Sequence, residues 1–257
     1  MELLSNPNAW IALLTLTFLE IVLGIDNIIF ISIATGKLPE DQRKRATKIG
    51  MFLAMFMRIL LLLGITVLIA MKEPWFSFDW GFLSAQVSGQ GIILLLGGLF
   101  LIYKSTSEIH EKVDNKGSEE KSAGKKAATT FGNVIIQIIL IDLVFSIDSI
   151  LTAVGMTNGV EGSLYIMIAA VVISVFIMMQ FAVPVGNFVN KNPSIQILGL
   201  AFLILIGLML VTEAAHLSNA LVFGSHVTPL PKGYLYFAIA FSLLVEVLNM
   251  KMSKRKK

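Results

Sequence analysis

Two short stretches of the sequence carry acidic side chains inside otherwise apolar runs. The first reads EIVLGIDNI and the second, 122 residues later, reads DLVFSIDSI. Their carboxylates are Glu20 and Asp26 in the first stretch, and Asp142 and Asp148 in the second. A charged side chain at bilayer depth costs about 2.5–3.5 kcal/mol, so four of them need a compensating partner. Lipid cannot be that partner, whereas a metal ion, a proton or a basic side chain can.

The polar side chains available in the apolar runs narrow the choice of partner. The chain has no cysteine, and its three histidines lie at the ends of apolar runs or in a loop. The candidate metal ligands are therefore oxygen donors, namely Glu20, Asp26, Asn27, Asp142, Asp148 and Ser149. The accessory candidates are Arg58, Glu213 and Glu246. Oxygen ligands suit Mg²⁺, Ca²⁺ and Mn²⁺ better than zinc or copper, and the residues alone leave these three ions open.

The spacing of the paired carboxylates constrains the helices that would carry them. Six positions on a straight helix turn two side chains about 120° apart. For both to point at one centre, the helix has to unwind, bulge or bend between them. Gly24 would permit this in the first stretch, whereas Ser146 stands at the matching position of the second.

Seven apolar segments surround and follow these stretches. Of the 257 residues, 56% are hydrophobic and only 14% are charged, which is typical of a membrane protein. A helix needs about 20 apolar residues to cross a bilayer. The sequence therefore predicts an all-α polytopic membrane protein with seven transmembrane helices, near residues 10–34, 49–71, 91–107, 131–156, 164–189, 195–211 and 233–250.

The two halves of the chain resemble each other at a fixed offset. The acidic stretches match residue by residue at an offset of 122, which also places Arg58 opposite Gln180. Because each repeat holds three spans, the second must enter the membrane from the opposite side, as in secondary transporters with a site at the repeat interface. The predicted organisation is an inverted three-helix repeat plus one extra helix: repeat one (residues 1–110), a flexible cytoplasmic linker (111–128), repeat two (129–216), and a loop, last helix and basic tail (217–257).

Basic residues predict how the chain is oriented. Seventeen of the 20 lysines and arginines fall in the loops and tail on one side of the seven segments, and only Lys72 and Lys232 fall on the other. The positive-inside rule then places the N-terminus outside and the C-terminus in the cytoplasm. The apolar N-terminal segment lacks a preceding basic region, so it is expected to be a true span and not a signal peptide. No nucleic-acid-binding motif is present.

The chain resembles the TerC family of bacterial integral membrane proteins. The resemblance rests on both acidic stretches, on LLGGLFLIYKSTSEIHE and on GYLYFAIAFSLLVEVLNM, and it covers nearly the whole chain. It implies a multi-pass protein of the bacterial inner membrane, associated with manganese export and historically with tellurium resistance. The acidic residues of the family carry over onto Glu20, Asp26, Asp142 and Asp148. Mn²⁺ is then the expected transported substrate, and no tightly bound cofactor is expected; because tellurite is an anion, any tellurium phenotype is expected to be indirect.

Protons are the expected coupling ion. Four neighbouring carboxylates repel one another, so some should hold protons when the metal is absent and release them when it arrives. The sequence therefore predicts Mn²⁺/H⁺ exchange through a site between the first and fourth spans, with Asp26 or Asp148 as the proton carrier.

Other functions are compatible with parts of this pattern. The acids could be structural, pairing with Arg58 to lock helices together. An intramembrane aspartyl protease also needs two aspartates, but its Gly-x-Gly-Asp sequence is absent, and no enzymatic activity is expected. A seven-helix receptor would not need duplicated halves. Among transporters, the alternative is an exporter of a small organic solute such as an amino acid.

Overall fold

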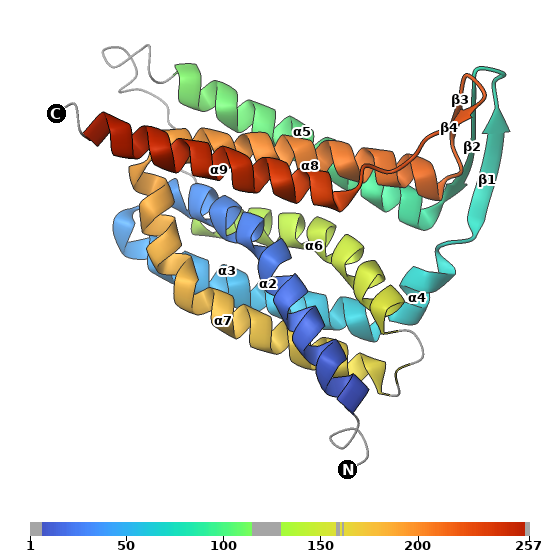
Figure 1. The fold of residues 1–257 in the computed structure, drawn as a ribbon, viewed down its shortest axis with the longest axis horizontal. Coiled ribbons are helices and arrows are strands. Elements are labelled where there is room, and N and C mark those ends of the chain that lie inside the picture. The colour runs from blue at the N-terminus through green and yellow to red at the C-terminus, as the bar shows by residue number, and fades with distance from the viewer. Residues whose placement is uncertain (1–6, 115–129, 158–159, 161, 255–257) are drawn as a thin grey trace. The chain divides into compact units, whose positions relative to one another are not determined.

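Seven long helices make up most of the structure, which is a computed structural model (Figure 1). It describes residues 7–114, 130–157, 160 and 162–254, without the side chains of residues 25, 26, 253 and 254. Within this part, seven helices are long and apolar enough to cross a membrane, which confirms the predicted fold class. They are α2 (Pro7–Gly36), α3 (Glu40–Leu63), α5 (Gly89–Asp114), α6 (Phe131–Met156), α7 (Ser163–Lys191), α8 (Pro193–Leu217) and α9 (Lys232–Lys254).

The helices α2 and α6, which carry the acidic stretches, are both continuous. Neither unwinds between its two carboxylate positions, so the unwinding that Gly24 would permit is not observed. Runs of Leu, Ile and Val without an internal proline hold each helix together through these positions. On a continuous helix, Asp142 and Asp148 point in directions about 120° apart.

The second predicted span is divided into two helices. Glu40 and Asp41 favour the start of α3, because acidic side chains in a first turn interact well with the helix dipole. The helix ends at Gly64, whose backbone N–H bonds to the carbonyl of Leu60, and the short helix α4 (Ile65–Ala70) follows. Glycine is among the weakest helix formers, which explains a break that hydropathy alone did not predict.

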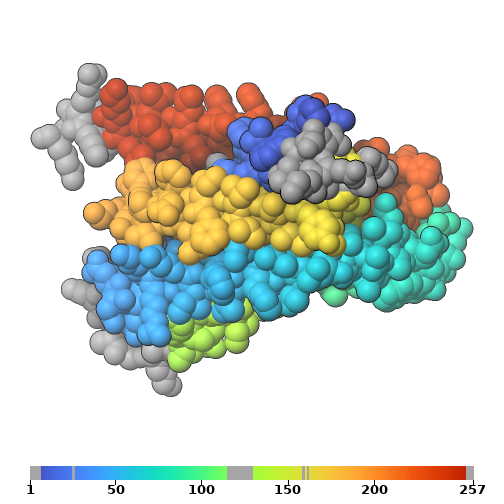
Figure 2. Space-filling view, turned by 90° about the horizontal axis from the view of Figure 1, so that it is seen from below, coloured from blue at the N-terminus to red at the C-terminus, as the bar shows by residue number. Residues whose placement is uncertain are grey.

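The first of two compact units, residues 1–69 and 128–191, contains α2, α3, α6 and α7. Within it, α2 packs along α7, and α3 packs along both α6 and α7. Figure 2 shows α7 lying side by side with α3 on one face. Small residues allow the close approach: a Cβ at Gly50 would lie 2.8 Å from the side chain of Ile138, and one at Gly186 would lie 3.0 Å from Ser32 Oγ.

The second unit, residues 70–127 and 192–257, contains α5, α8, α9 and a small sheet. The backbones of α5 and α8 touch, since a Cβ at Gly98 would lie 2.6 Å from the carbonyl oxygen of Gly207. The α9 helix packs on α8 and leaves most of its side chains exposed, as suits a lipid-facing helix. The α5 helix extends through Asp114, into the segment predicted as a linker, and residues 115–129 lie outside the described part.

The sheet joins two connections that are far apart in the sequence. Its antiparallel strands follow the order β1 (Pro74–Asp79), β2 (Leu83–Ser88), β3 (Leu221–Val222) and β4 (Ser225–His226). Both hairpin turns contain a glycine with positive φ, Gly81 at 78° and Gly224 at 75°. The connection before α5 and the connection before α9 therefore lie together at one end of this unit, which agrees with their predicted location on the same side of the membrane. The sequence analysis did not predict the sheet.

Helix pairing crosses the two predicted repeats. Each compact unit combines helices from both halves of the sequence. Exchanging α2 with α6 and α3 with α7 converts the α2–α7 pair into the α6–α3 pair, and both pairs are observed. This is the pattern that a two-fold relation between the halves requires, although the repeat itself stays a prediction.

Candidate functional site

A buried arginine joins three helices of the first unit. Arg58 on α3 contacts Glu20 on α2 through Nη1, and its Nη2 donates to Asp142 Oδ1 on α6 at 2.9 Å. Arg58 and Glu20 are each 4% exposed, and Asp142 is 8% exposed. Buried charges are tolerated when they are paired and hydrogen-bonded, which is the case for these three side chains.

Asp142 is the centre of this network. Its Oδ1 accepts hydrogen bonds from Arg58 and from Asn27 Nδ2, the latter at 3.4 Å. Its Oδ2 accepts from Ser146 Oγ at 3.1 Å, and the same Ser146 oxygen accepts from Arg58 Nε at 3.0 Å. Two carboxylates and one guanidinium give the group a formal charge of −1 when both acids are ionised. Arg58 alone therefore does not neutralise the site.

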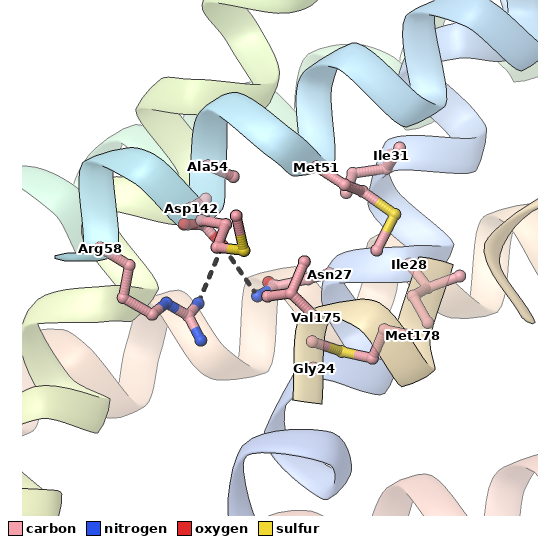
Figure 3. A pocket seen from close by; sticks show the side chains of 11 residues that line it. Gly24, Asn27, Ile28, Ile31, Met51, Ala54, Arg58, Asp142, Val175 and Met178 are labelled. Atoms are coloured by element: carbon pink, nitrogen blue, oxygen red, sulfur yellow. Dashed lines mark hydrogen bonds and ion pairs between the residues drawn. The ribbon is translucent and has the colours of Figure 1, made fainter. Parts of the chain in front are cut away.

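A small cavity opens beside Asp142, as Figure 3 shows. Its volume of about 20 Å³ suffices for one water-sized occupant. Asn27 Oδ1 is buried and accepts no hydrogen bond from the described residues. The lining residues come from four helices: Gly24, Asn27, Ile28 and Ile31 from α2, Met51, Ala54, Met55 and Arg58 from α3, Asp142 from α6, and Val175 and Met178 from α7.

The structure brings some of the predicted ligands together. Glu20 and Asp142 both contact Arg58, and Asp142 and Asn27 line the cavity, whereas Glu20 is not among the described residues that line it. Ser149 is buried, but its hydroxyl donates to the carbonyl of Ser146 at 3.2 Å within the same helix. Arg58, proposed from the sequence as an accessory residue, is instead central.

Other predicted ligands are not placed at the cavity. Asp148 is half-buried and is not among the described residues that line it. Asp26 lies in α2, but its side chain is outside the described part, so its role stays a prediction. Glu213 on α8 and Glu246 on α9 belong to the second unit. Within the described residues, no three acidic or histidine side chains converge closely enough to hold a metal ion.

Sequence reasoning missed the methionine wall of the cavity, formed by Met51, Met55 and Met178. A signal was present: Met51, Met55 and Arg58 are separated by four and then three positions, which puts them on one face of α3. The restriction to oxygen donors overlooked these thioethers. The predicted pairing of spans one and four was also incomplete, because α3 and α7 contribute to the same cavity.

The fold and this site define a polytopic helical membrane protein with an ionic network inside its helix bundle. Residues 5–257 match the model of the integral membrane protein TerC family, and the chain belongs to this family. It is 45% identical over 252 residues to the UPF0053 inner membrane protein YgdQ of Escherichia coli strain K12, covering 98% of this chain and 97% of that protein.

Two further relatives extend the comparison. A UPF0053 protein of Haemophilus influenzae is 43% identical over 256 residues, covering 100% of this chain and 99% of the relative. The inner membrane protein YoaE of Escherichia coli strain K12 is 44% identical over 250 residues, which cover 97% of this chain but 44% of YoaE. No solved structure matches the chain.

Proposed function

We propose that this protein is a transporter that moves divalent metal ions, with Mn²⁺ foremost, out of the cell through the cavity beside Asp142. The observation that carries the proposal is the excess of negative charge: two buried carboxylates share one arginine next to a cavity of ionic size. Intramembrane acids usually mark the path of a substrate ion or a proton. The family resemblance favours manganese, and the inner-membrane names of relatives suit export from the bacterial cytoplasm.

Arg58 has a defined part in this proposal. It pairs with Glu20 and Asp142 and so compensates part of their charge inside the membrane. A divalent ion that enters the cavity competes with the guanidinium for Asp142. The metal and Arg58 then alternate on Asp142, and the return of Arg58 helps to expel the metal.

Proton exchange completes the proposed cycle. When the metal leaves, the remaining negative charge favours uptake of a proton by a neighbouring carboxylate, and we assign this role to Asp26 or Asp148. Export of a cation against an inward-directed potential needs such coupling, since each charge moved costs about 2.3 kcal/mol per 100 mV.

The size of the cavity favours an ion over the alternative substrate, a small organic solute. A volume of about 20 Å³ admits one water-sized occupant and is too small for an amino acid. The test is flux through the purified protein in liposomes, with Mn²⁺ and a panel of amino acids offered separately. Mn²⁺ entry without amino-acid entry supports the proposal, and the reverse result would replace it with the solute exporter.

A further inference from the structure

We propose that Met178, with Met51, supplies thioether sulfur to the metal ion, so that the cavity prefers transition-metal ions to Mg²⁺ and Ca²⁺. The inference rests on the proposed function and deepens it, because it identifies the residues that select the substrate. Carboxylate and amide oxygens alone would accept Mn²⁺, Mg²⁺ and Ca²⁺. A sulfur ligand introduces a preference that the oxygens lack.

The Met178 side chain lies against the backbone of a neighbouring helix. A Cβ added to Gly24 would collide with Met178 Sδ, so the sulfur lies directly against the backbone of α2. Gly24 is three positions before Asn27, which places the sulfur and the Asn27 amide on the same side of the helix. In the view of Figure 3, Arg58 approaches Asp142 from one side, and Met51 and Met178 lie on the opposite side, beyond Asn27.

The oxygen of Asn27 is an independent indication that a cation belongs in the cavity. Asn27 Nδ2 donates to Asp142, while Asn27 Oδ1 is buried without a hydrogen-bond donor among the described residues. Leaving a buried acceptor unsatisfied is costly, and a cation in the cavity would satisfy it. Asp142 and Asn27 then supply oxygen from one side, and Met51 and Met178 supply sulfur from the other. Both methionines are buried, at 4% and 6% exposure, so bulk water does not compete with their sulfurs for the metal ion.

This mixed ligand set discriminates by hardness. Mg²⁺ and Ca²⁺ bind oxygen and gain little from a thioether that replaces one of their water molecules. Divalent transition metals accept sulfur as well as nitrogen and oxygen, increasingly so for softer ions. A site built from carboxylates alone would distinguish Mn²⁺ from Mg²⁺ poorly, because oxygen ligands suit both ions.

The test is selectivity in liposomes that contain the full-length protein. Met178→Leu keeps the volume and removes the sulfur; we expect the preference for Mn²⁺ over Mg²⁺ to fall about tenfold, the lower end of the affinity losses seen when a group supporting a metal site is removed. Gly24→Ala displaces the end of Met178 and should reduce the preference in the same direction. Met167→Leu, at a buried methionine of α7 outside the cavity, is the matched control and should leave the preference unchanged.

A spectroscopic measurement separates a ligand from a packing residue. With Cd²⁺ as a soft probe, X-ray absorption of the parent protein should show a metal–sulfur shell that Met178→Leu weakens. If the parent transports Mn²⁺ but shows no metal–sulfur shell, and Met178→Leu keeps its selectivity, Met178 only fills space and the inference is wrong while the proposed function stands. If the parent neither binds nor transports any divalent ion, the proposed function fails and the inference fails with it.

Discussion

Arg58 is the residue on which the fold and the proposed activity both depend. Its planar guanidinium offers donors in two directions and so reaches carboxylates on two different helices at once, which a lysine cannot do in the same geometry. Gln180, its counterpart in the predicted repeat, is exposed and neutral. At the offset of 122 residues, the arginine that balances the charge of the site has no basic counterpart in the second half of the sequence.

The first prediction concerns this arginine. Arg58→Gln leaves Glu20 and Asp142 buried without their counter-ion, and breaking a buried ion pair costs about 3–5 kcal/mol of unfolding free energy. We expect a large drop in the thermal denaturation midpoint of the variant in detergent. Added Mn²⁺ should raise the midpoint again, because the metal can bind the carboxylates without competition from the guanidinium.

The matched control is Gln180→Ala, which should change neither the midpoint nor its response to Mn²⁺. A purely structural ion pair predicts a different result: Arg58→Gln would be destabilised, and Mn²⁺ would give no recovery.

At the scale of the elements, the packing of small residues decides how closely the helices approach. Gly98 and Gly207 let α5 and α8 touch through their backbones, and Gly24 lets a side chain of α7 reach the backbone of α2. The first contact is rigid, because a Cβ would meet a carbonyl oxygen. The second is adjustable, because a Cβ would meet the end of a flexible methionine.

The second prediction follows from the rigid contact. Gly98→Ala places a Cβ 2.6 Å from the Gly207 carbonyl oxygen, so the helices must separate, at a cost of about 1–3 kcal/mol. Thermal denaturation in detergent should show the loss. Gly132→Ala is the control, since a Cβ there meets nothing within 4 Å and alanine favours the helix. Equal midpoints for the two variants would contradict the close packing of α5 and α8.

Some of the elements could be predicted from the sequence and others could not. Hydropathy predicted the bounds of α6 because the apolar run there ends abruptly at both sides. It missed the division of the second span at Gly64. It also missed the sheet, whose last two strands have two residues each and join the first two through the pairing of β3 with the distant strand β2. The acidic motifs predicted Glu20, Asp142 and Asn27 together, because charge inside an apolar run needs a partner. The methionine wall was not predicted, because the spacing of Met51, Met55 and Arg58 puts them on one face of α3 without showing which cavity that face lines.

At the scale of the whole molecule, the distribution of charge and the connectivity agree with one orientation. The connections that form the sheet contain few basic residues, whereas five lie between the end of α2 and the first turns of α3, namely Lys37, Arg43, Lys44, Arg45 and Lys48. We propose from this pattern that the sheet lies outside the cytoplasm and that the C-terminus lies within it.

The third prediction tests that orientation. Because the chain has no cysteine, single substitutions can be labelled without background. Ser77→Cys on exposed β1 should react with a membrane-impermeant maleimide in intact spheroplasts, and Lys44→Cys on α3 should react only after the membrane is opened. The opposite pattern would invert the proposed topology.

The fourth prediction concerns coupling. Because exchange moves protons opposite to Mn²⁺, the interior of liposomes that contain the protein and an internal pH dye should become more alkaline as Mn²⁺ enters. An imposed proton gradient should drive Mn²⁺ against its own gradient. Asp148→Asn should weaken this coupling, with Ser149→Ala as a neighbouring control that leaves the carboxylate in place. Manganese flux that neither changes the internal pH nor responds to a proton gradient would rule out exchange and favour passive movement.

The most direct test of the central claim is Mn²⁺ flux through Asp142→Asn in liposomes, measured beside the thermal midpoint of the same variant. Asparagine keeps the shape of the side chain, and one remaining carboxylate, Glu20, still balances Arg58, so the fold should survive. Loss of the anionic ligand should lower Mn²⁺ flux at limiting metal by about 10- to 100-fold. A variant that keeps its midpoint and loses its flux is the predicted result. A variant that transports Mn²⁺ at the parent rate would contradict the account, because Asp142 would then serve the structure alone.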